Sequence, residues 1–221
     1  MMLKNINIYI FKIKKYGELM NKQVDLFENK SKSWDMNSKR VQNAKGIAEL
    51  IVKNIKLNKS MELMDFGAGT GLLSYFVAPY VDKIVAVDNS PSMLKEFHAK
   101  CNEFACKTEV IEKDLSTQTL ERTFDGIISS MTIHHLEDTA ALLSKLYAML
   151  PKGGFIALAD LDSEDGSFHS DNTGVFHYGF DRHILAEHAQ NAGFKDISFS
   201  LASTISKPQA EFTVFLMTAV K

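Results

Sequence analysis

The sequence of 221 residues has only two cysteines, four prolines and one tryptophan. Cys101 and Cys106 stand five positions apart in a segment predicted to be helical. That spacing places the two thiols on different sides of a helix, which disfavours a disulfide between them. Two thiols are also too few for a zinc site of the usual kind. We therefore expect reduced cysteines, a cytoplasmic protein and no metal site.

Long apolar runs and an excess of charge of one sign are absent too. The net charge is −2, from 25 basic and 27 acidic residues, so the whole chain is not drawn to nucleic acid or to an acidic membrane. The apolar stretch 6–13 is interrupted by Asn7 and Lys12 and is far shorter than the roughly 20 residues of a spanning helix. We expect no nucleic-acid partner, no membrane partner, and a monomer or homodimer.

Residues 1–19 are basic and apolar, and two interpretations explain them. The first is an interfacial or docking segment with a basic face. The second is that translation starts at Met20, because Gly17-Glu18 can be encoded by a GGAGAA sequence that resembles a bacterial ribosome-binding site. We favour the second, in which 1–19 are a non-native or flexible extension, 20–57 a helical lid and 58–221 the main domain. The intact mass of the native protein distinguishes the two.

From Ser38 onwards the sequence predicts alternating helices and strands. Apolar residues recur every three or four positions from Ser38 to about Ile55, which indicates a helix with Ser38 as its N-cap. Short apolar runs that end at turn residues indicate buried strands. The predicted strands are 61–66, 83–87, 108–112, 124–130, 154–161, 197–202 and 212–220, and the further helices are 71–78, 91–105, 138–150 and 181–192.

The order of these elements predicts an α/β fold with a doubly wound, seven-stranded, mostly parallel sheet. Strands that are apolar throughout, rather than alternating, are typical of a sheet covered on both faces. Only the short connection 206–208 is expected between the last two strands. These two strands are therefore expected to pair as a hairpin, with one of them antiparallel to the rest of the sheet.

Polar and glycine-rich features fall where the predicted strands end, which is where open α/β sheets bind ligands. The turn Asp65-Phe66-Gly67-Ala68-Gly69-Thr70-Gly71 follows the first strand, and its glycines let the backbone approach a ligand without Cβ clashes. Asp88 ends the second strand. There it can accept both hydroxyls of a ribose, or it can cap the helix that begins at Pro91.

The third and fourth strand ends carry weaker signals. Asp114-Leu115 follows the third strand, where the acid can accept from an adenine amino group and the leucine can cover a ring, or the acid can belong to a solvated loop. The adjacent histidines His134 and His135 follow the fourth strand and suit a base, a hydrogen-bond donor or a packed turn. A metal site is the least favoured reading because the two rings diverge and no third ligand is evident.

Together these features resemble the class I S-adenosylmethionine-dependent methyltransferase family, in its small-molecule branch. The matching stretches lie in order at 64–74, 84–94, 112–115, 124–138 and 150–162. The resemblance implies a Rossmann-like methyltransferase fold, S-adenosyl-L-methionine as cofactor and S-adenosylhomocysteine as product. It also implies that the cofactor contacts Asp65 (near its amino group), Gly67, Ala68 and Gly69 (methionine and ribose), Asp88 (ribose hydroxyls), Asn89 and Met93 (flanking the adenine), Asp114 and Leu115 (adenine edge and face) and Ser130 (through its backbone).

The acceptor half of the expected site has no diagnostic motif. A histidine suits proton transfer near neutral pH. The four acids of residues 160–165 are interpreted as a solvated loop rather than as a site for a cationic acceptor or a divalent ion. Trp34 either packs on the ligands or anchors the lid to the core. The catalytic candidates are His134, His135 and His177, followed by His169, and a pocket for a small-molecule acceptor is expected to include Trp34, His135, His177 and Tyr178.

Two other functions fit part of the sequence. A nicotinamide dehydrogenase needs the glycine spacing of a dinucleotide site, which Gly67, Gly69 and Gly71 do not reproduce. The alternative that we retain is a non-catalytic S-adenosylmethionine-binding regulatory or assembly protein on the same fold. Calorimetry with the two cofactors separates the dehydrogenase, and release of S-adenosylhomocysteine over a panel of acceptors separates the regulator.

Overall fold

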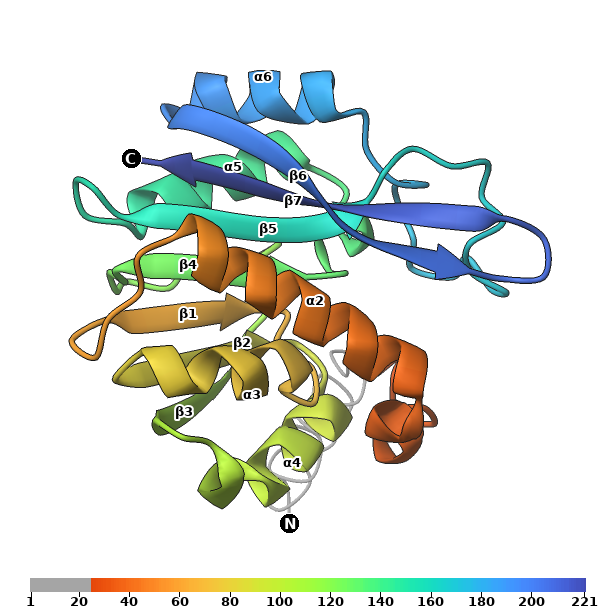
Figure 1. The fold of residues 1–221 in the computed structure, drawn as a ribbon, viewed down its shortest axis with the longest axis horizontal. Coiled ribbons are helices and arrows are strands. Elements are labelled where there is room, and N and C mark those ends of the chain that lie inside the picture. The colour runs from red at the N-terminus through yellow and green to blue at the C-terminus, as the bar shows by residue number, and fades with distance from the viewer. Residues whose placement is uncertain (1–24) are drawn as a thin grey trace, which may run out of the picture.

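The computed structural model describes residues 25–221 and builds them around one seven-stranded sheet (Figure 1). The strand order is β3-β2-β1-β4-β5-β7-β6. Strands β1 to β5 are parallel, and β7 runs antiparallel to both β5 and β6. The predicted fold and the terminal hairpin are therefore confirmed. The strands are β1 (Glu62–Phe66), β2 (Lys83–Asp88), β3 (Lys107–Glu112), β4 (Gly126–Ser130), β5 (Phe155–Leu161), β6 (Lys195–Ser206) and β7 (Glu211–Val220).

Helices cover both faces of this sheet because successive strand residues point to opposite sides. Leu63 of β1 packs with the helices α2 and α3, whereas its neighbour Met64 packs with α5 and α6. Figure 1 looks onto α2 and α3 in front of the sheet. The α-helices are α2 (Ser38–Asn54), α3 (Leu72–Val77), α4 (Pro91–Ala99), α5 (Thr139–Ala148) and α6 (Arg182–Ala192), and the 3-10 turns are η1 (Ser31–Met36), η2 (Ala78–Tyr80), η3 (Cys101–Glu103) and η4 (Ile133–His135).

Two helix boundaries differ from the predictions. Asn37, not Ser38, caps α2, because the Asn37 side-chain oxygen accepts from the N–H groups of Lys39 and Arg40 at 3.0 and 3.2 Å. Helix α4 ends at Ala99 rather than near residue 105, because the chain turns there and the ring of Phe104 stacks on Phe97 at 4.8 Å. Cys101 and Cys106 consequently follow α4, and both thiols are free.

The predicted lid 20–57 divides into two parts. Helix α2 is a layer of the fold, with Ile47 and Ile51 fully buried against the sheet and α3. Residues 25–37 lie at the carboxyl edge of the sheet, on the right in Figure 1. The interpretation of residues 1–19 and the first part of the lid, 20–24, fall outside the described residues. Within 25–221, no helix has the length and apolar character needed to span a bilayer.

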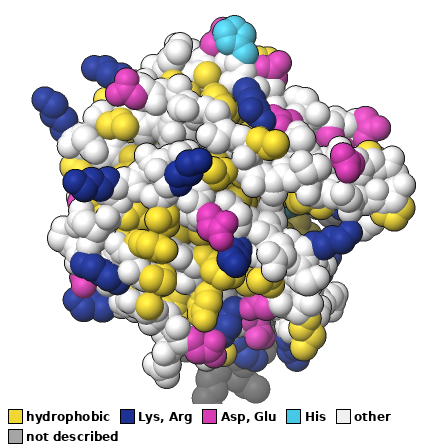
Figure 2. Space-filling view, in the orientation of Figure 1, with side chains coloured by type: hydrophobic (Ala, Val, Ile, Leu, Met, Phe, Trp, Pro, Cys, Tyr) yellow, Lys and Arg dark blue, Asp and Glu magenta, His cyan; other side chains and the backbone are white. Residues whose placement is uncertain are grey.

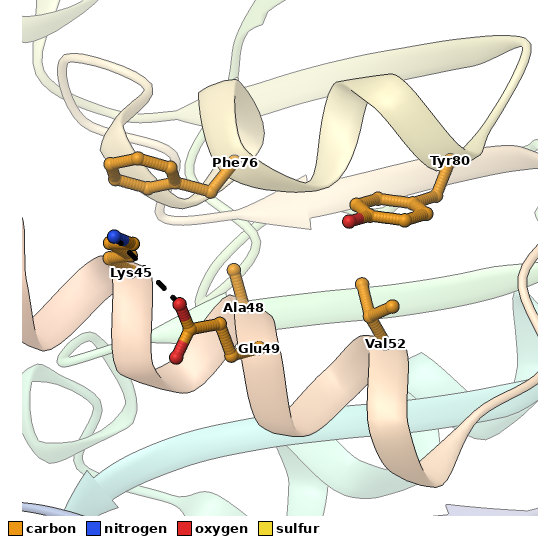
Figure 3. A pocket seen from close by; sticks show the side chains of 6 residues that line it. All are labelled: Lys45, Ala48, Glu49, Val52, Phe76 and Tyr80. Atoms are coloured by element: carbon orange, nitrogen blue, oxygen red, sulfur yellow. Dashed lines mark ion pairs between the residues drawn. The ribbon is translucent and has the colours of Figure 1, made fainter.

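A shallow groove of about 150 Å³ separates α2 from α3 and η2 on the outer surface (Figure 3). Figure 2 shows apolar side chains gathered on this face of the molecule. Phe76 and Tyr80 form one wall of the groove and Val52 the other, and Lys45 pairs with Glu49 at 3.9 Å along the α2 side. The groove therefore lies on the helical surface and not at the carboxyl edge of the sheet.

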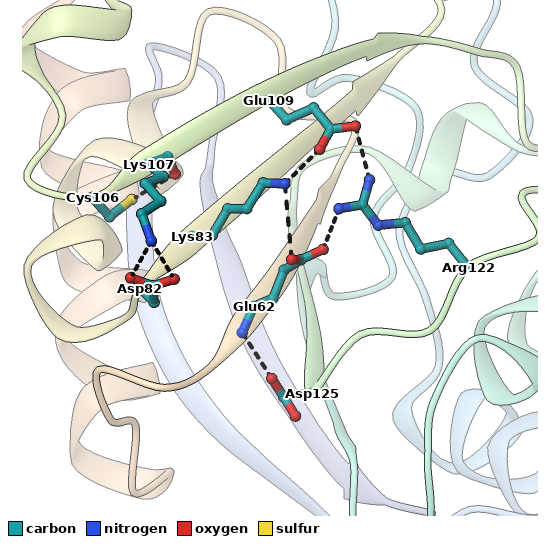
Figure 4. Close-up of polar contacts among 8 residues, drawn as sticks. All are labelled: Glu62, Asp82, Lys83, Cys106, Lys107, Glu109, Arg122 and Asp125. Atoms are coloured by element: carbon teal, nitrogen blue, oxygen red, sulfur yellow. Dashed lines mark hydrogen bonds and ion pairs between the residues drawn. The ribbon is translucent and has the colours of Figure 1, made fainter.

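An ion-pair network joins the amino-terminal ends of the strands, at the opposite edge (Figure 4). Arg122 donates to Glu109 at 2.8 Å and also to Glu62, and Lys83 donates to Glu109 at 2.6 Å. These hydrogen bonds lower the pKa of Glu109 to about 2. A lowered carboxyl pKa stabilises the folded state at pH values above 4.5, the ordinary pKa of this group. This stabilisation is lost as the pH falls from 4.5 toward 2.

We expect Glu109→Gln to lower the free energy of unfolding at pH 7 by no more than about 1 kcal/mol, because solvent screens a network whose side chains are 23–36% exposed. The difference from wild type should shrink as the pH falls below 4.5, the ordinary pKa of this carboxyl. Urea unfolding at several pH values measures it. Glu112→Gln, at the exposed end of the same strand, is the matched control, and an equal effect of both variants would contradict the role of the network.

Candidate functional site

The candidate site lies at the carboxyl edge, between β1 and β4. The strand order reverses there, so the turns after these strands part and leave room for a ligand. Gly67 N–H donates to the Val87 carbonyl at 2.8 Å, which ties the glycine turn to β2. After β4, Met131 adopts a φ of 57°, which is uncommon for a residue with a side chain. The hydroxyl of Thr132 then donates to the carbonyl of Gly67 at 3.3 Å.

The glycines of this turn are required for different reasons. Gly67 and Gly69 both have positive φ, of 68° and 55°. A Cβ atom on Gly67 would overlap the side chain of Thr132, whereas a Cβ atom on Gly69 would meet no atom within 4 Å. Gly67 therefore serves close packing, and Gly69 faces open space on the side where a ligand would approach.

We expect Gly67→Ala to destabilise the protein by about 3 kcal/mol or more, because it adds overlap with Thr132 to the backbone strain. Gly69→Ala is the matched variant, since it carries only the strain of positive φ, roughly 1–2 kcal/mol. Urea unfolding of both proteins measures the difference. Equal destabilisation would show that the contact with Thr132 is not what Gly67 is needed for.

Asp65 lies in β1, just before the turn. Its side chain is buried and accepts from the Ser74 hydroxyl of α3 at 2.5 Å. Burial raises the pKa of Asp65 to about 7, with the negative charge of Asp88 adding to the rise and the Ser74 hydrogen bond opposing it. Asp65 thus joins the glycine turn to the helix that follows.

Asp88 points at the glycine turn with a fixed carboxylate. One oxygen accepts from Gly69 N–H and the other from Ser90 N–H, both at 2.8 Å. The cap of α4 is Ser90, whose hydroxyl oxygen accepts from Met93 N–H at 3.2 Å. Burial raises the pKa of Asp88. The helix-cap role considered for Asp88 is therefore filled by Ser90, and the carboxylate of Asp88 is held against the backbone of the glycine turn.

The other predicted cofactor residues lie around this turn with varied exposure. Asn89 is exposed, whereas Met93 and Leu115 are buried. One carboxylate oxygen of Asp114 accepts from the backbone N–H and the hydroxyl of Ser116. The carbonyl of Ser130 accepts from the Thr132 hydroxyl at 3.2 Å. The loops after β1, β2, β3 and β4 thus place the predicted residues along one edge.

A buried His–Asp pair joins the turn after β4 to β5. His134 Nδ1 and Asp160 Oδ1 are 2.7 Å apart, and the second carboxylate oxygen accepts from the His134 backbone N–H at 3.2 Å. Both side chains are at most 1% exposed. The Nε2 atom of His134 is buried and has no hydrogen-bond partner within residues 25–221. Its ring lies 4.1 Å from the His135 ring, measured between centroids.

The interpretation of residues 160–165 as a solvated loop is therefore wrong at its start. Asp160 is fully buried at the end of β5, because its carboxylate satisfies His134 and the N–H of Leu161. Asp162 is held by Arg182 at 2.6 Å and by the Thr213 hydroxyl at 2.6 Å. The sequence did contain a signal for this buried pair. Asp160 stands inside an apolar run, and an acid inside a buried strand needs a partner.

The other candidate histidines, His135, His169 and His177, divide into two groups. His135 and His169 lie 5.9 Å apart, and burial is the main cause that lowers the pKa of each to about 4, so both are neutral at pH 7. His135 Nδ1 lies 2.7 Å from the Gly174 carbonyl, a distance that suits donation to it. His177 Nε2 lies 2.9 Å from the Leu136 carbonyl, and Tyr178 is 47% exposed. The structure brings His134, His135 and His169 together, whereas the His177 ring nitrogen is engaged with the backbone.

The segment 25–37 bridges the glycine turn and the histidines. Asp35 accepts from the Thr70 hydroxyl at 2.5 Å and pairs with Lys100. The ring of Phe27 contacts those of Trp34 and His135, with centroids 5.9 and 5.7 Å apart. Trp34 is therefore attached to the site through Phe27. Sequence reasoning missed Phe27 and Asp35, because no local pattern marks contacts between segments so far apart.

No metal centre is evident in the described part of the chain. Within residues 25–221, no three His, Cys, Asp or Glu side chains are placed to hold an ion. The histidine cluster instead contains the buried pair of His134 and Asp160 and the neutral imidazoles of His135 and His169.

Comparison with known proteins agrees with this geometry. A family model described as a methyltransferase domain matches residues 38–198. An uncharacterized methyltransferase of Schizosaccharomyces pombe is 31% identical over 179 residues, which are 74% of this chain and 62% of that protein. A phosphoethanolamine N-methyltransferase of Triticum aestivum is 28% identical over 149 residues, or 65% of this chain and 30% of that protein. The chain thus spans less than two thirds of the length of these relatives.

Solved structures of methyltransferases share this fold. Phosphoethanolamine N-methyltransferase 2 of Haemonchus contortus, in complex with S-adenosyl-L-methionine, superposes with a TM-score of 0.65 at 17% identity. The match covers 90% of this chain and 61% of that one. The sequence-based prediction of the family is confirmed, and the chain belongs to the class I S-adenosylmethionine-dependent methyltransferase family.

Proposed function

We propose that this protein transfers the methyl group of S-adenosylmethionine to a small-molecule acceptor and releases S-adenosylhomocysteine. The observation that carries the proposal is the open side of Gly69, where no atom lies within 4 Å of an added Cβ, beside the fixed carboxylate of Asp88. The relatives named for phosphoethanolamine support a small acceptor. The two free cysteines support a reducing, cytoplasmic setting.

The residues at the carboxyl edge fit the cofactor. A carboxylate has about four lone-pair sites, and two of those on Asp88 are used by backbone N–H groups, so two remain for the hydroxyls of a ribose. Gly67, Ala68 and Gly69 supply the close backbone approach. Asn89, Met93, Asp114 and Leu115 surround the position proposed for the adenine, and the Ser130 backbone and Asp65 complete the proposed set.

When bound, S-adenosylmethionine supplies a methyl group that its positive sulfonium already activates for in-line transfer. The task of the protein is then to align the acceptor and to exclude water. Asp35 fastens residues 25–37 to the glycine turn, and Phe27 fastens them to His135. These contacts close the segment over the site and leave the histidine rings on the acceptor side.

A proton must leave the acceptor when its attacking atom is protonated. His134 suits this task, because Asp160 can hold the Nδ1 proton and leaves Nε2 as the acceptor. His135 and His169 are neutral neighbours that can also accept hydrogen bonds. His177 stays a candidate that no contact with the other histidine rings supports, and Tyr178 stays a candidate for the acceptor pocket.

Titration calorimetry with S-adenosylmethionine, S-adenosylhomocysteine and a nicotinamide dinucleotide tests the cofactor half of this proposal. We expect binding of the first two only. Release of S-adenosylhomocysteine over a panel of small amines, phosphorylated amines, phenols and carboxylic acids tests the reaction. Tight cofactor binding with no turnover on any acceptor would favour the regulatory or assembly role, and binding of the dinucleotide alone would overturn the proposal.

A further inference from the structure

A continuous set of ring contacts joins α2, η1, the histidines and the loop after β5. Neighbouring members lie 3.8 to 5.9 Å apart, measured between ring centroids or from a cation to a centroid. We name this set the aromatic circuit. From Arg40 the contacts pass through Trp34, Phe27, His135, His169 and Phe168 to Lys207.

Both ends of the aromatic circuit are cations, and they lie near each other. Burial lowers the pKa of Lys207, Glu164 opposes this, and the positive charges of Arg40 and Lys39 lower it further. Lys39, the residue before Arg40, donates from its Nζ to the carbonyl of Ser206, the residue before Lys207, at 2.8 Å. The start of α2 therefore lies against the turn between β6 and β7, which brings the two cations to the same part of the surface. Lys207 donates one hydrogen bond, to the carbonyl of Phe168, and an ammonium has three donors.

Acids of the described chain balance the positive charge at this place only in part, since Glu164 is the one acid that acts on Lys207 beside the cations Arg40 and Lys39. Within residues 25–221, the guanidinium of Arg40 has no ion pair and no hydrogen bond, although burial lowers its pKa. One oxygen of Glu164 accepts from the N–H groups of Gly166 and Phe168, and the other is buried without a hydrogen-bond partner in the described part of the chain. The contact with Trp34 uses the flat face of the Arg40 guanidinium, so its five N–H donors stay free to bind an anion.

A second observation concerns two buried ring nitrogens of the same cluster. His134 is 1% exposed, and its Nε2 atom lies in the same ring cluster without a partner in the described part of the chain. The Nε2 of His169, the member that follows His135 in the circuit, is also buried and unpartnered there. Phe168 contacts both His169 and Lys207, so the unpartnered nitrogens and the cations belong to one connected cluster.

We propose that the methyl acceptor carries an anionic group, a phosphate or a carboxylate, and that Arg40 and Lys207 bind it. The inference rests on the proposed function, and it names the substrate class of the same site. The planar fork of Arg40 can bind either anion with two parallel hydrogen bonds, and Lys207 adds a point charge. The reacting atom of the acceptor then lies toward His134 and His135.

Binding of inorganic phosphate and of acetate to the full chain tests this site, at constant ionic strength and with and without saturating S-adenosylhomocysteine. We expect Arg40→Gln and Lys207→Gln each to weaken binding of the preferred anion at least about tenfold, the loss of one charge-assisted contact. Arg40→Lys should restore part of the affinity, because the charge returns. Lys53→Gln, on an exposed position of α2, is the matched control and should bind as wild type.

The outcomes separate the anion site from the proposed function. Weaker anion binding in both glutamine variants, with folding unchanged by circular dichroism, supports the site, and the preferred anion names the acceptor group. No anion binding, or equal binding by wild type and both variants, overturns it. If S-adenosylhomocysteine fails to bind while anion binding follows Arg40 and Lys207, the proposed function falls and the anion site stands.

Discussion

Asp88→Ala is expected to weaken the binding of S-adenosylmethionine by at least about 100-fold, because two hydrogen bonds that the ribose hydroxyls donate to a charged carboxylate are lost. The carboxylate is oriented before any ligand arrives, since Gly69 and Ser90 each hold one oxygen at 2.8 Å. A ribose that binds there incurs no cost for ordering the side chain. Titration calorimetry with S-adenosylhomocysteine measures the loss without turnover.

The same substitution removes the acceptor of two backbone N–H groups, so a control must separate a loosened turn from a lost ligand contact. Asp125→Ala is matched, because Asp125 also accepts a backbone N–H, that of Glu62 at 2.8 Å, at the opposite edge of the sheet. We expect it to cost stability and to leave cofactor affinity unchanged. Wild-type affinity in Asp88→Ala would place the ribose elsewhere.

The fold was predictable because its signals are local. Each central strand is a short apolar run, and Ser90-Pro91 starts α4 as a cap followed by proline in the first turn. The boundaries that differed depend on contacts the chain makes after folding. Phe104 ends the predicted helix early by stacking on Phe97, and β6 runs beyond its predicted range because β7 pairs with it along most of its length.

The site was predictable only in part, for the same physical reason. The cofactor half follows strand ends, and a parallel sheet places those ends at one edge whatever else the chain does. The acceptor half depends on pairs far apart in sequence, such as Phe27 with His135 and Asp160 with His134. Arg40 was predicted only as part of a helix, and nothing local shows that its side chain lies on Trp34.

The second large effect is expected when the pair of His134 and Asp160 is broken. Asp160→Ala is expected to destabilise the protein by about 3–5 kcal/mol, because three buried donors lose their acceptor at roughly 1–3 kcal/mol each. These are His134 Nδ1–H and the backbone N–H groups of His134 and Leu161. The pKa of Asp160 is lowered by His134 and these bonds against the effect of burial. The stabilisation is therefore present at pH values above 3.8, the ordinary pKa of an aspartate, and is lost as the pH falls below that value.

Asp160→Asn distinguishes a catalytic from a structural role for the pair. The amide has about the volume of the carboxylate, so we expect a smaller loss of stability, but its N–H₂ group no longer ensures that the His134 proton sits on Nδ1. Proton acceptance at Nε2 then fails in part of the molecules. We expect kcat to fall about 100-fold or more on an acceptor that must lose a proton, with little change in cofactor affinity.

The position of the imidazole proton decides between the two roles, because packing alone does not depend on it. Nitrogen NMR of histidine-labelled protein should show His134 protonated at Nδ1 in wild type and a mixture of tautomers in Asp160→Asn. Asp162→Asn is the matched control, since Asp162 is held by Arg182 and Thr213 and not by His134. A slow variant with an unchanged tautomer would make the pair structural. The proton would then have to leave through another group, of which His135 and His169 are the neighbours in ring contact with His134.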